Sequence, residues 1–441
     1  MPAERNSENA FAGNSFQNAS SGNPATNVSP ESSANNTDTE GNPAESNPSK
    51  SWKRLDGVDL LRGLAIFFVL MNHVNMRLLL NQVPYARSWP KPLLGALVWN
   101  GQFGVQMFFA VSGFLITSTS LRRWKSLDQV SVRDFYAMRF ARIVPLLFAL
   151  LAVLSALHFA NFPSFRVGEQ TGGLGRAILA ALTFHVNVLE ANRGYLPPNW
   201  DVLWSLSVEE MFYLFFPLMC WIFGRTKFLY VLLFAFVALG PLARTVLAHG
   251  NETWQEYSYL GGMDAIALGC LTALLLFHRK FSRNAIRRFT LGGIALVAFI
   301  LGFAHWRPMF PLGATGLEET ILAIGTCGVM IAAAQTQWRS PGWLSPLRNL
   351  GQRSYEVYLT HMFVVLALLA VFQRLQKPAW FVSVYFVLTV LFAGALGEIV
   401  ARYYSEPANR GLRRWFGDGA ERLGSAIDKK EAAAKPLGTA E

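Results

Sequence analysis

Charged residues are scarce in this sequence, and their scarcity excludes an ordinary soluble protein. Asp, Glu, Lys and Arg together make up 15% of the 441 residues, whereas soluble domains are typically about 25% charged. Hydrophobic residues make up 52%. They gather in repeated runs of the ~18 or more residues that a helix needs to cross a bilayer. The sequence therefore predicts an integral membrane protein.

Cysteine is also scarce, with three residues in the chain. Cys220, Cys270 and Cys327 lie singly inside apolar runs, so neither disulfides nor a zinc site is expected. The sequence contains no G-x-S-x-G elbow, no H-E-x-x-H pair and no G-x-x-x-x-G-K-[ST] loop. These absences exclude the common serine-hydrolase, zinc-protease and P-loop sites, and no metal site is expected.

Aromatic residues are almost absent from residues 1–50, where Asn, Ser, Ala, Gly, Pro and Thr dominate. Such a segment cannot bury enough apolar surface to offset the entropy lost on ordering. It also lacks the short basic start and apolar core of a signal peptide. We therefore expect a disordered cytoplasmic tail over 1–50, a membrane domain over 51–405 and a cytoplasmic tail over 406–441.

The apolar runs predict about ten transmembrane helices in an all-α, polytopic bundle. They lie at 58–80, 96–120, 143–160, 204–223, 228–248, 262–278, 289–305, 317–335, 354–372 and 380–402. An eleventh segment, 174–190, is shorter and more polar. If it does not cross and the N-terminus is cytoplasmic, the inner loops carry twice as many Arg and Lys residues as the outer loops. This bias obeys the positive-inside rule and reverses if the segment crosses. We therefore expect ten crossings, cytoplasmic N- and C-termini, and 174–190 in the outer leaflet.

The first predicted span carries two ionisable residues that are costly in a membrane. Arg62 and His73 are eleven residues apart, so they share a helix face and lie about 16 Å apart along the axis. Asp59 precedes Arg62 by three residues and can pair with it. Intramembrane charges mark functional sites by default. A snorkelling Arg62 and a hydrogen bond from His73 to a neighbouring helix would explain the pattern equally well.

Two further segments place polar residues on spans 2 and 3. Residues 101–117 carry Ser112 among three glycines, which suits either a ligand beside the backbone or close helix packing. Arg139 and Arg142 lie one helical turn apart at the predicted cytoplasmic end of span 3. Guanidinium groups bind phosphate through a bidentate fork, but membrane anchoring also places arginines at such an end.

The fourth and ninth spans carry polar stripes at helical spacing. Ser205, Glu209 and Tyr213 recur every four residues, and Glu209 lies inside an otherwise apolar span. Such a carboxylate either takes part in function or pairs with an arginine. Tyr358 and His361 share a face of span 9 near its cytoplasmic end, where His361 serves either chemistry or a structural contact with the tyrosine.

Taken in this order, the segments resemble the membrane-bound acyltransferase-3 family. The matching blocks are D-x-x-R-G-L-A with a histidine eleven residues after its arginine, F-G-V-x-x-F-F-x-x-S-G-F-L-I, R-x-x-R-I-x-P, W-S-L-S-V-E-E-x-F-Y and S-Y-x-x-Y-L-T-H. The resemblance covers residues 55–405. In two places the sequence departs from the family pattern. The segment LDGVDLLRG is three residues longer than the usual LDGLRG, so Asp59 and not Asp56 is the expected functional aspartate. Met211 stands where the family more often has a polar residue.

The resemblance implies an enzyme with an acyl-CoA donor that arrives from the cytosol. The acceptor hydroxyl is presented from the membrane or the outer side. Carried over by position, Arg62 and His73 are the essential pair, Arg139 and Arg142 contact the donor, and Glu209 is the carboxylate of the span-4 block. Some members carry a fused extracytoplasmic SGNH domain, which we do not expect here.

We therefore predict an O-acyltransferase of the bacterial inner (plasma) membrane that uses acyl-CoA as co-substrate and no bound cofactor. It transfers an acyl group, acetyl in the simplest case, to a hydroxyl of a glycan, a lipid-linked saccharide or a small molecule. His73 is the predicted general base, since an imidazole with a pKa of about 6.5 suits proton transfer near neutral pH. Arg62 orients His73 or the thioester, Arg139 and Arg142 bind CoA phosphates, and Glu209 positions the acceptor or an arginine.

The remaining predicted site residues are supporting ones, namely Asp59, Ser112, Ser205, Tyr213, Tyr358 and His361. Three alternatives stay open at this point. The acyl group can pass through an acyl-His73 intermediate. The same Arg, His and Glu side chains can line the path of a proton-coupled transporter or flippase. The fold can also serve as a receptor or scaffold without catalysis, although the presence of Arg62, His73 and Glu209 disfavours this.

Overall fold

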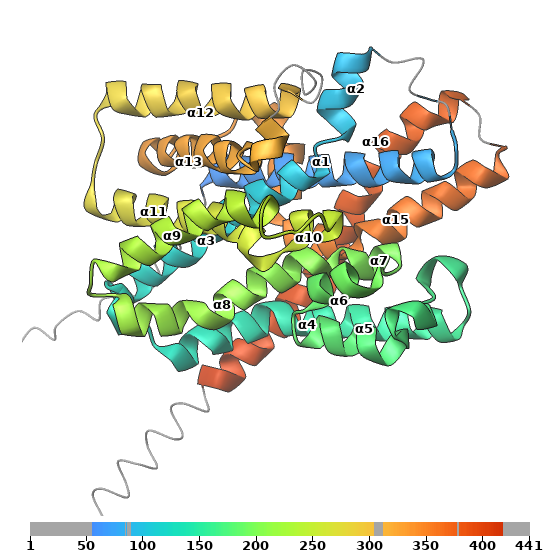
Figure 1. The fold of residues 1–441 in the computed structure, drawn as a ribbon, viewed down its shortest axis with the longest axis horizontal. Helices are drawn as coiled ribbons and strands as arrows, with labels where there is room; N and C mark the ends of the chain where they lie inside the picture. Colours follow the sequence, from blue (N-terminus) through green and yellow to red (C-terminus); the bar gives the residue numbers. More distant parts are fainter. Residues whose placement is uncertain (1–54, 84, 86–89, 304–311, 377–378, 418–441) are drawn as a thin grey trace, which may run out of the picture. The chain divides into compact units, whose positions relative to one another are not determined.

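The structure is a computed structural model that describes residues 55–83, 85, 90–303, 312–376 and 379–417. These residues form helices α1–α16 joined by loops and short 3₁₀ turns, and no β-strand occurs among them (Figure 1). The predicted all-α class is confirmed. The predicted tail at 1–50 lies outside the described residues, as does the chain beyond Gly417.

The helices follow one another closely along the chain. They are α1 (Asp56–Leu80), α2 (Lys91–Val98), α3 (Gly101–Trp124), α4 (Val132–Phe159), α5 (Gly173–Leu182), α6 (Val186–Arg193), α7 (Pro198–Asp201), α8 (Leu203–Phe223), α9 (Phe228–Arg244), α10 (Glu252–Tyr257), α11 (Tyr259–His278), α12 (Arg283–Phe303), α13 (Glu318–Thr336), α14 (Ser345–Gln352), α15 (Ser354–Arg374) and α16 (Ala379–Val400). After α16 the chain passes through a π-helical turn, Ala401–Ser405, and stays helical to Gly417. The predicted C-terminal tail therefore begins as helix.

Nine helices in the described part of the chain are long and apolar enough to cross a membrane, and the chain is a multi-pass membrane protein. The one predicted span that is not among these nine is 228–248, which forms α9 and has 17 helical residues. At 1.5 Å per residue it rises about 26 Å, less than the ~30 Å of a hydrocarbon core. The segment predicted not to cross, 174–190, forms the short helices α5 and α6 with a bend between them at Phe184, whose φ is 55°. The sides on which the termini lie stay a prediction.

Small residues allow α3 and α11 to pack backbone against backbone. A Cβ atom added to Gly113 would lie 2.0 Å from the carbonyl oxygen of Ile266. One added to Gly269 would lie 2.0 Å from the carbonyl oxygen of Ala110. Because no larger residue fits at either place, these glycines set how closely the two helices approach. The contact also fixes the position of Ser112, which neighbours Gly113 on α3.

A buried aspartate fixes the N-terminal end of α1 beside α14. The Asp56 carboxylate accepts hydrogen bonds from the Arg339 and Arg348 side chains at 3.2 and 3.3 Å. Asp59, one turn further along α1, accepts a hydrogen bond from Gln352 at 3.1 Å. These contacts fix the first turn of α1 and therefore the position of Arg62, which follows Asp59 by one turn.

A second buried ion pair is structural. The Arg244 guanidinium on α9 pairs with Asp264 on α11, with Nη2 and Oδ2 2.7 Å apart, and also donates to the carbonyl oxygen of Gly316 and to Thr320. A buried ion pair of this kind is tolerated only when its remaining hydrogen-bonding groups are satisfied. The cluster therefore ties α9, α11 and the start of α13 together.

Candidate active site

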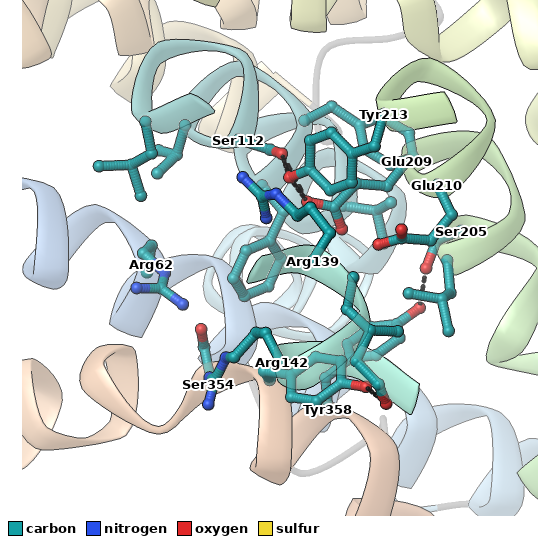
Figure 2. A pocket seen from close by; sticks show the side chains of 18 of the residues that line it. Arg62, Ser112, Arg139, Arg142, Ser205, Glu209, Glu210, Tyr213, Ser354 and Tyr358 are labelled. Carbon is teal, nitrogen blue, oxygen red and sulfur yellow. Dashed lines mark hydrogen bonds between the residues drawn. The ribbon is translucent and has the colours of Figure 1, made fainter. Parts of the chain in front are cut away.

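A cavity of about 230 Å³ lies where α1, α3, α4, α8 and α15 meet. Figure 2 labels ten of the side chains that line it: Arg62, Ser112, Arg139, Arg142, Ser205, Glu209, Glu210, Tyr213, Ser354 and Tyr358. Each of the five sequence blocks contributes at least one of them. Three predicted residues, Asp59, His73 and His361, do not line the cavity.

One wall of the cavity is a hydrogen-bonded cluster that joins α3 to α8. Ser112 Oγ and Tyr213 OH each donate to Glu209 Oε1 at 2.5 Å, and the two hydroxyls also contact each other. The Arg139 guanidinium of α4 lies over the Tyr213 ring, 4.0 Å from its centre. Such a contact is a cation–π interaction. The cluster fixes Glu209 at the cavity wall and brings one predicted donor arginine beside it (Figure 2).

The second predicted donor arginine is held by a residue that the sequence analysis missed. Arg142 makes a two-pronged contact with Glu356 on α15, with Nη1–Oε1 and Nη2–Oε2 distances of 2.7 and 3.3 Å. Glu356 is 1% exposed. The fork of Arg142 is therefore already occupied by a carboxylate. Among the described residues Arg139 has no such ion pair, so its guanidinium is the one available to an anion.

Further arginines gather near these two. Arg413, on the helical extension beyond α16, lies close enough to Arg123, Arg139 and Arg142 for their charges to repel one another. Arg123 lies in the last turn of α3 and Arg413 in the predicted tail, and the sequence analysis singled out neither. Like charges at short range are destabilising unless an opposite charge binds between them. The arrangement suits a ligand with several negative charges.

Arg62 reaches the cavity from α1. Its guanidinium lies 3.9 Å from the Asp59 carboxylate, so the aspartate that pairs with it is the one expected from the sequence and not Asp56. The Arg62 side chain is 22% exposed and points toward the cavity in Figure 2. Asp59 thus orients Arg62 although it does not itself line the cavity.

Tyr358 lines the cavity and also contacts His361, one of two neighbouring imidazoles. Its hydroxyl lies 2.6 Å from Ser205 Oγ, which joins α15 to α8 at the cavity wall (Figure 2). Its carbonyl oxygen accepts a hydrogen bond from His361 Nδ1 at 2.6 Å. Since a carbonyl can only accept, Nδ1 carries the proton and Nε2 is left as an acceptor. That Nε2 atom is buried and has no partner among the described residues.

His73 lies against His361 and not against the cavity. The two ring centres are 5.0 Å apart, and within the described residues no hydrogen bond to either ring nitrogen of His73 is formed. Arg62 and His73 both face α15, as their spacing predicts. Spacing alone does not reveal that His73 packs against His361 of α15. The two histidines are not among the arginines, carboxylates and hydroxyl groups that line the cavity.

Comparison with known proteins places the whole membrane region in one family. The family model described as "Acyltransferase domain" matches residues 55–398. The chain is 25% identical over 391 residues to "Peptidoglycan O-acetyltransferase OatA" of Listeria monocytogenes serovar 1/2a, a match that covers 82% of this chain and 56% of the relative. It is 23% identical over 392 residues to "O-acetyltransferase OatA" of Staphylococcus aureus, covering 82% of this chain and 60% of the relative. The chain thus spans somewhat more than half the length of these curated relatives. No solved structure matches it.

Proposed function

Because this chain belongs to the membrane acyltransferase family whose model matches residues 55–398, we propose that it transfers an acetyl group from acetyl-CoA to a saccharide hydroxyl. The acceptor class follows from the relatives, which are named as O-acetyltransferases, one of them of peptidoglycan. The single observation that carries the proposal is the cavity itself. It joins arginines, carboxylates and hydroxyl groups from five helices in one pocket inside an apolar bundle.

The arginines of the cavity support a CoA donor in particular. CoA carries a diphosphate and a further phosphate, and guanidinium groups bind phosphate strongly and in two-pronged geometry. Arg139 is free of ion pairs with the described carboxylates, and Arg123 and Arg413 add positive charge nearby. A cavity of about 230 Å³ is smaller than the ~300–1,000 Å³ of sites that enclose a whole drug-sized ligand. It therefore takes the acyl-thioester arm, while the phosphates bind at Arg139 in the cavity wall and at Arg123 and Arg413, which do not line the cavity.

The remaining residues divide between donor and acceptor. Arg62, held by Asp59, is the cation nearest to the thioester end and stabilises the charge that develops on its carbonyl oxygen. His73 removes the proton of the attacking hydroxyl, with His361 beside it. The hydroxyl oxygen forms an ester bond with the acyl carbon, the carbon–sulfur bond breaks, and the proton finally passes to the CoA thiolate. Glu209, Ser112 and Tyr213 hold the cavity wall in shape around the reacting groups.

The proposal is tested with the full chain in lipid nanodiscs, acetyl-CoA labelled in its acetyl group, and chitotetraose as a soluble saccharide. The wild type is expected to form labelled saccharide ester. Arg139→Ala is expected to raise the KM for acetyl-CoA at least tenfold, whereas the control Arg287→Ala, an exposed arginine on α12, leaves it unchanged. Absence of ester with both chitotetraose and purified peptidoglycan, or an unchanged KM in Arg139→Ala, would contradict the proposal.

A further inference from the structure

Outside the arginine cavity, acidic and aromatic side chains gather at one corner of the bundle. We name it the α6–α7 corner and define it by Glu190 on α6, Tyr195 in the following loop, Asp201 on α7 and Tyr257 on α10. Helices α6, α7 and α10 lie beside α8 in Figure 1. None of these four residues lines the arginine cavity, and the proposed reaction assigns them no role so far.

The two carboxyl groups of the corner face each other. Tyr257 OH donates to Asp201 Oδ1 at 3.1 Å, and the backbone N–H of Leu196 donates to Glu190 Oε1 at 3.0 Å. Burial and the neighbouring Asp201 raise the pKa of Glu190 well above its ordinary value. A raised pKa favours the protonated carboxyl group, which can donate a hydrogen bond as well as accept one, and a sugar hydroxyl requires both kinds of partner.

The corner also contains buried polar atoms that lack partners. Glu190 is 1% exposed, yet its Oε2 atom has no hydrogen-bond partner among the described residues. The same holds for both amide atoms of Asn199 and for Trp200 Nε1, which lie on α7 next to Asp201 and are 0% exposed. Buried polar groups nearly always have partners in folded proteins. A concentration of exceptions on one short helix and its neighbour indicates a polar ligand or bound water.

Aromatic rings stand beside these polar atoms. Tyr195 is 59% exposed and meets Tyr257 edge to face, with ring centres 6.0 Å apart. Tyr257 in turn stacks on Trp204 at 4.0 Å with an interplanar angle of 6°, which holds it rigid. An aromatic face next to hydrogen-bonding groups matches a pyranose ring, because the sugar presents C–H bonds on its faces and hydroxyls at its edge.

The corner lies at the other end of α1 from the arginine cavity. Arg77 interacts electrostatically with Asp201 and is one turn beyond His73, so the two side chains share a face of α1. Arg62 and Arg77 are fifteen residues apart, about 22 Å along the axis. Along α1, His73 therefore lies between Arg62 at the donor cavity and Arg77 at the corner.

From these contacts we infer that the α6–α7 corner is the acceptor subsite, at which Tyr195 stacks on a sugar ring and the Glu190–Asp201 pair binds its hydroxyls. This inference rests on the proposed function and gives it a second binding site, for a neutral saccharide. An anionic acceptor group would be repelled by the two carboxyl groups, so the recognised part of the acceptor is the polyhydroxyl ring itself.

The test measures saccharide binding directly and separately from turnover. Full-length protein in nanodiscs is titrated with chitotetraose by isothermal calorimetry, in the wild type and in Tyr195→Ala, Tyr195→Trp and Asp201→Asn. Tyr195→Ala and Asp201→Asn are expected to weaken chitotetraose binding at least tenfold. Tyr195→Trp keeps a stacking ring and is expected to bind within threefold of the wild type. The control Tyr230→Ala, a partly exposed tyrosine on α9, is expected to bind normally.

The acyl donor provides the second readout. Acetyl-CoA affinity is expected to stay within twofold of the wild type in all corner variants, which also shows that they are folded. Wild-type protein that does not bind chitotetraose, or Tyr195→Ala protein that binds it normally, would overturn the inference. Wild-type protein that binds chitotetraose but forms no ester would leave the inference standing and overturn the proposed function instead.

Discussion

The two ends of α1 differ in the sign of the charge gathered around them. Around Arg62 the bundle brings in Arg139 and Arg142, with Arg123 and Arg413 nearby. Around Arg77 it brings in Glu190 and Asp201 with tyrosines. Since a binding site complements its ligand in charge, one end suits a polyphosphate and the other a neutral, hydroxyl-rich molecule. The difference supports the proposal that one bundle serves two substrates from opposite ends.

The two regions also differ in how their polar groups are satisfied. At the arginine cavity, Glu209 accepts two hydroxyl donors and Arg142 is paired with Glu356, so the walls are complete without a ligand. At the corner, Glu190 Oε2 and the Asn199 amide have no partners among the described residues. The cavity is therefore preorganised, whereas at the corner we propose that the acceptor supplies the missing partners. Preorganised donors lower the cost of binding and of charge development.

The imidazole pair between the two regions should give the largest effect when it is changed. His73→Ala removes the proposed general base, which typically contributes about 10²–10⁴-fold to the rate. We expect kcat for ester formation to fall by about 10²-fold or more, with the KM for acetyl-CoA little changed. The control is His278→Ala, an exposed histidine at the end of α11. Normal turnover by the His73 variant would contradict the proposal that His73 is the general base for the acceptor hydroxyl.

Breaking the buried ion pair at the arginine cavity should give the next largest effect. Glu356→Gln leaves the Arg142 guanidinium without its counter-charge, and breaking a buried pair costs about 3–5 kcal/mol. We expect a loss near the lower value, since Arg142 is 29% exposed, measured as the free energy of unfolding in an SDS titration. Glu398→Gln is the matched control, because the Glu398 side chain in its pair with Arg353 is 51% exposed and a pair with such an exposed member is worth about 0–1 kcal/mol. Equal losses in both variants would show that Glu356 is not the structural counter-charge.

A smaller effect is expected at the edge of the arginine region. Arg413→Ala removes one of the cations that face a polyphosphate but leaves Arg139 in place. We expect the KM for acetyl-CoA to rise about threefold, in line with the ~0.2–1 kcal/mol of an exposed charge pair, and the salt dependence of donor binding to weaken. The KM for chitotetraose should not change. A rise in the saccharide KM alone would contradict the assignment of the two ends.

The smallest effect concerns the pH dependence at the corner. The pKa of Glu190 is raised in the folded protein, so its contribution to stability is intact below its ordinary pKa of about 4.3. That contribution is lost as the pH rises toward the folded value. Glu190→Gln cannot ionise beside Asp201, and we expect its free energy of unfolding to fall less than that of the wild type between pH 5 and pH 9. The control Glu252→Gln, exposed at the start of α10, should follow the wild type. Identical pH profiles in all three proteins would show that Glu190 titrates normally.

The sequence predicted the membrane class and several of the residues that line the cavity because both depend on short-range patterns. Helical periodicity places Ser205, Glu209 and Tyr213 on one stripe, and the five blocks resemble one family in order. Glu356 was missed because only the packing of α4 against α15 brings it to Arg142. Arg413 was missed because it lies on the part of the last helix that continues beyond the apolar run.

The position of His73 shows a further limit of the pattern. Spacing along α1 gives the face on which a side chain lies but not which neighbour stands in front of it. His73 packs against His361, from a helix almost three hundred residues later in the chain, and does not line the cavity. Likewise α9 reads as a full span by composition, yet its helix ends at Arg244, whose guanidinium is held by Asp264. In both cases a tertiary contact determines a feature that the local sequence does not specify, namely the neighbour of His73 and the end of α9.

The central claim is that donor and acceptor bind at opposite ends of α1. It is tested most directly by steady-state kinetics with both substrates varied, in Arg139→Ala and Tyr195→Ala. The account predicts that Arg139→Ala raises only the KM for acetyl-CoA and that Tyr195→Ala raises only the KM for chitotetraose. If both variants raise the same KM, the two regions belong to one site and the account is wrong.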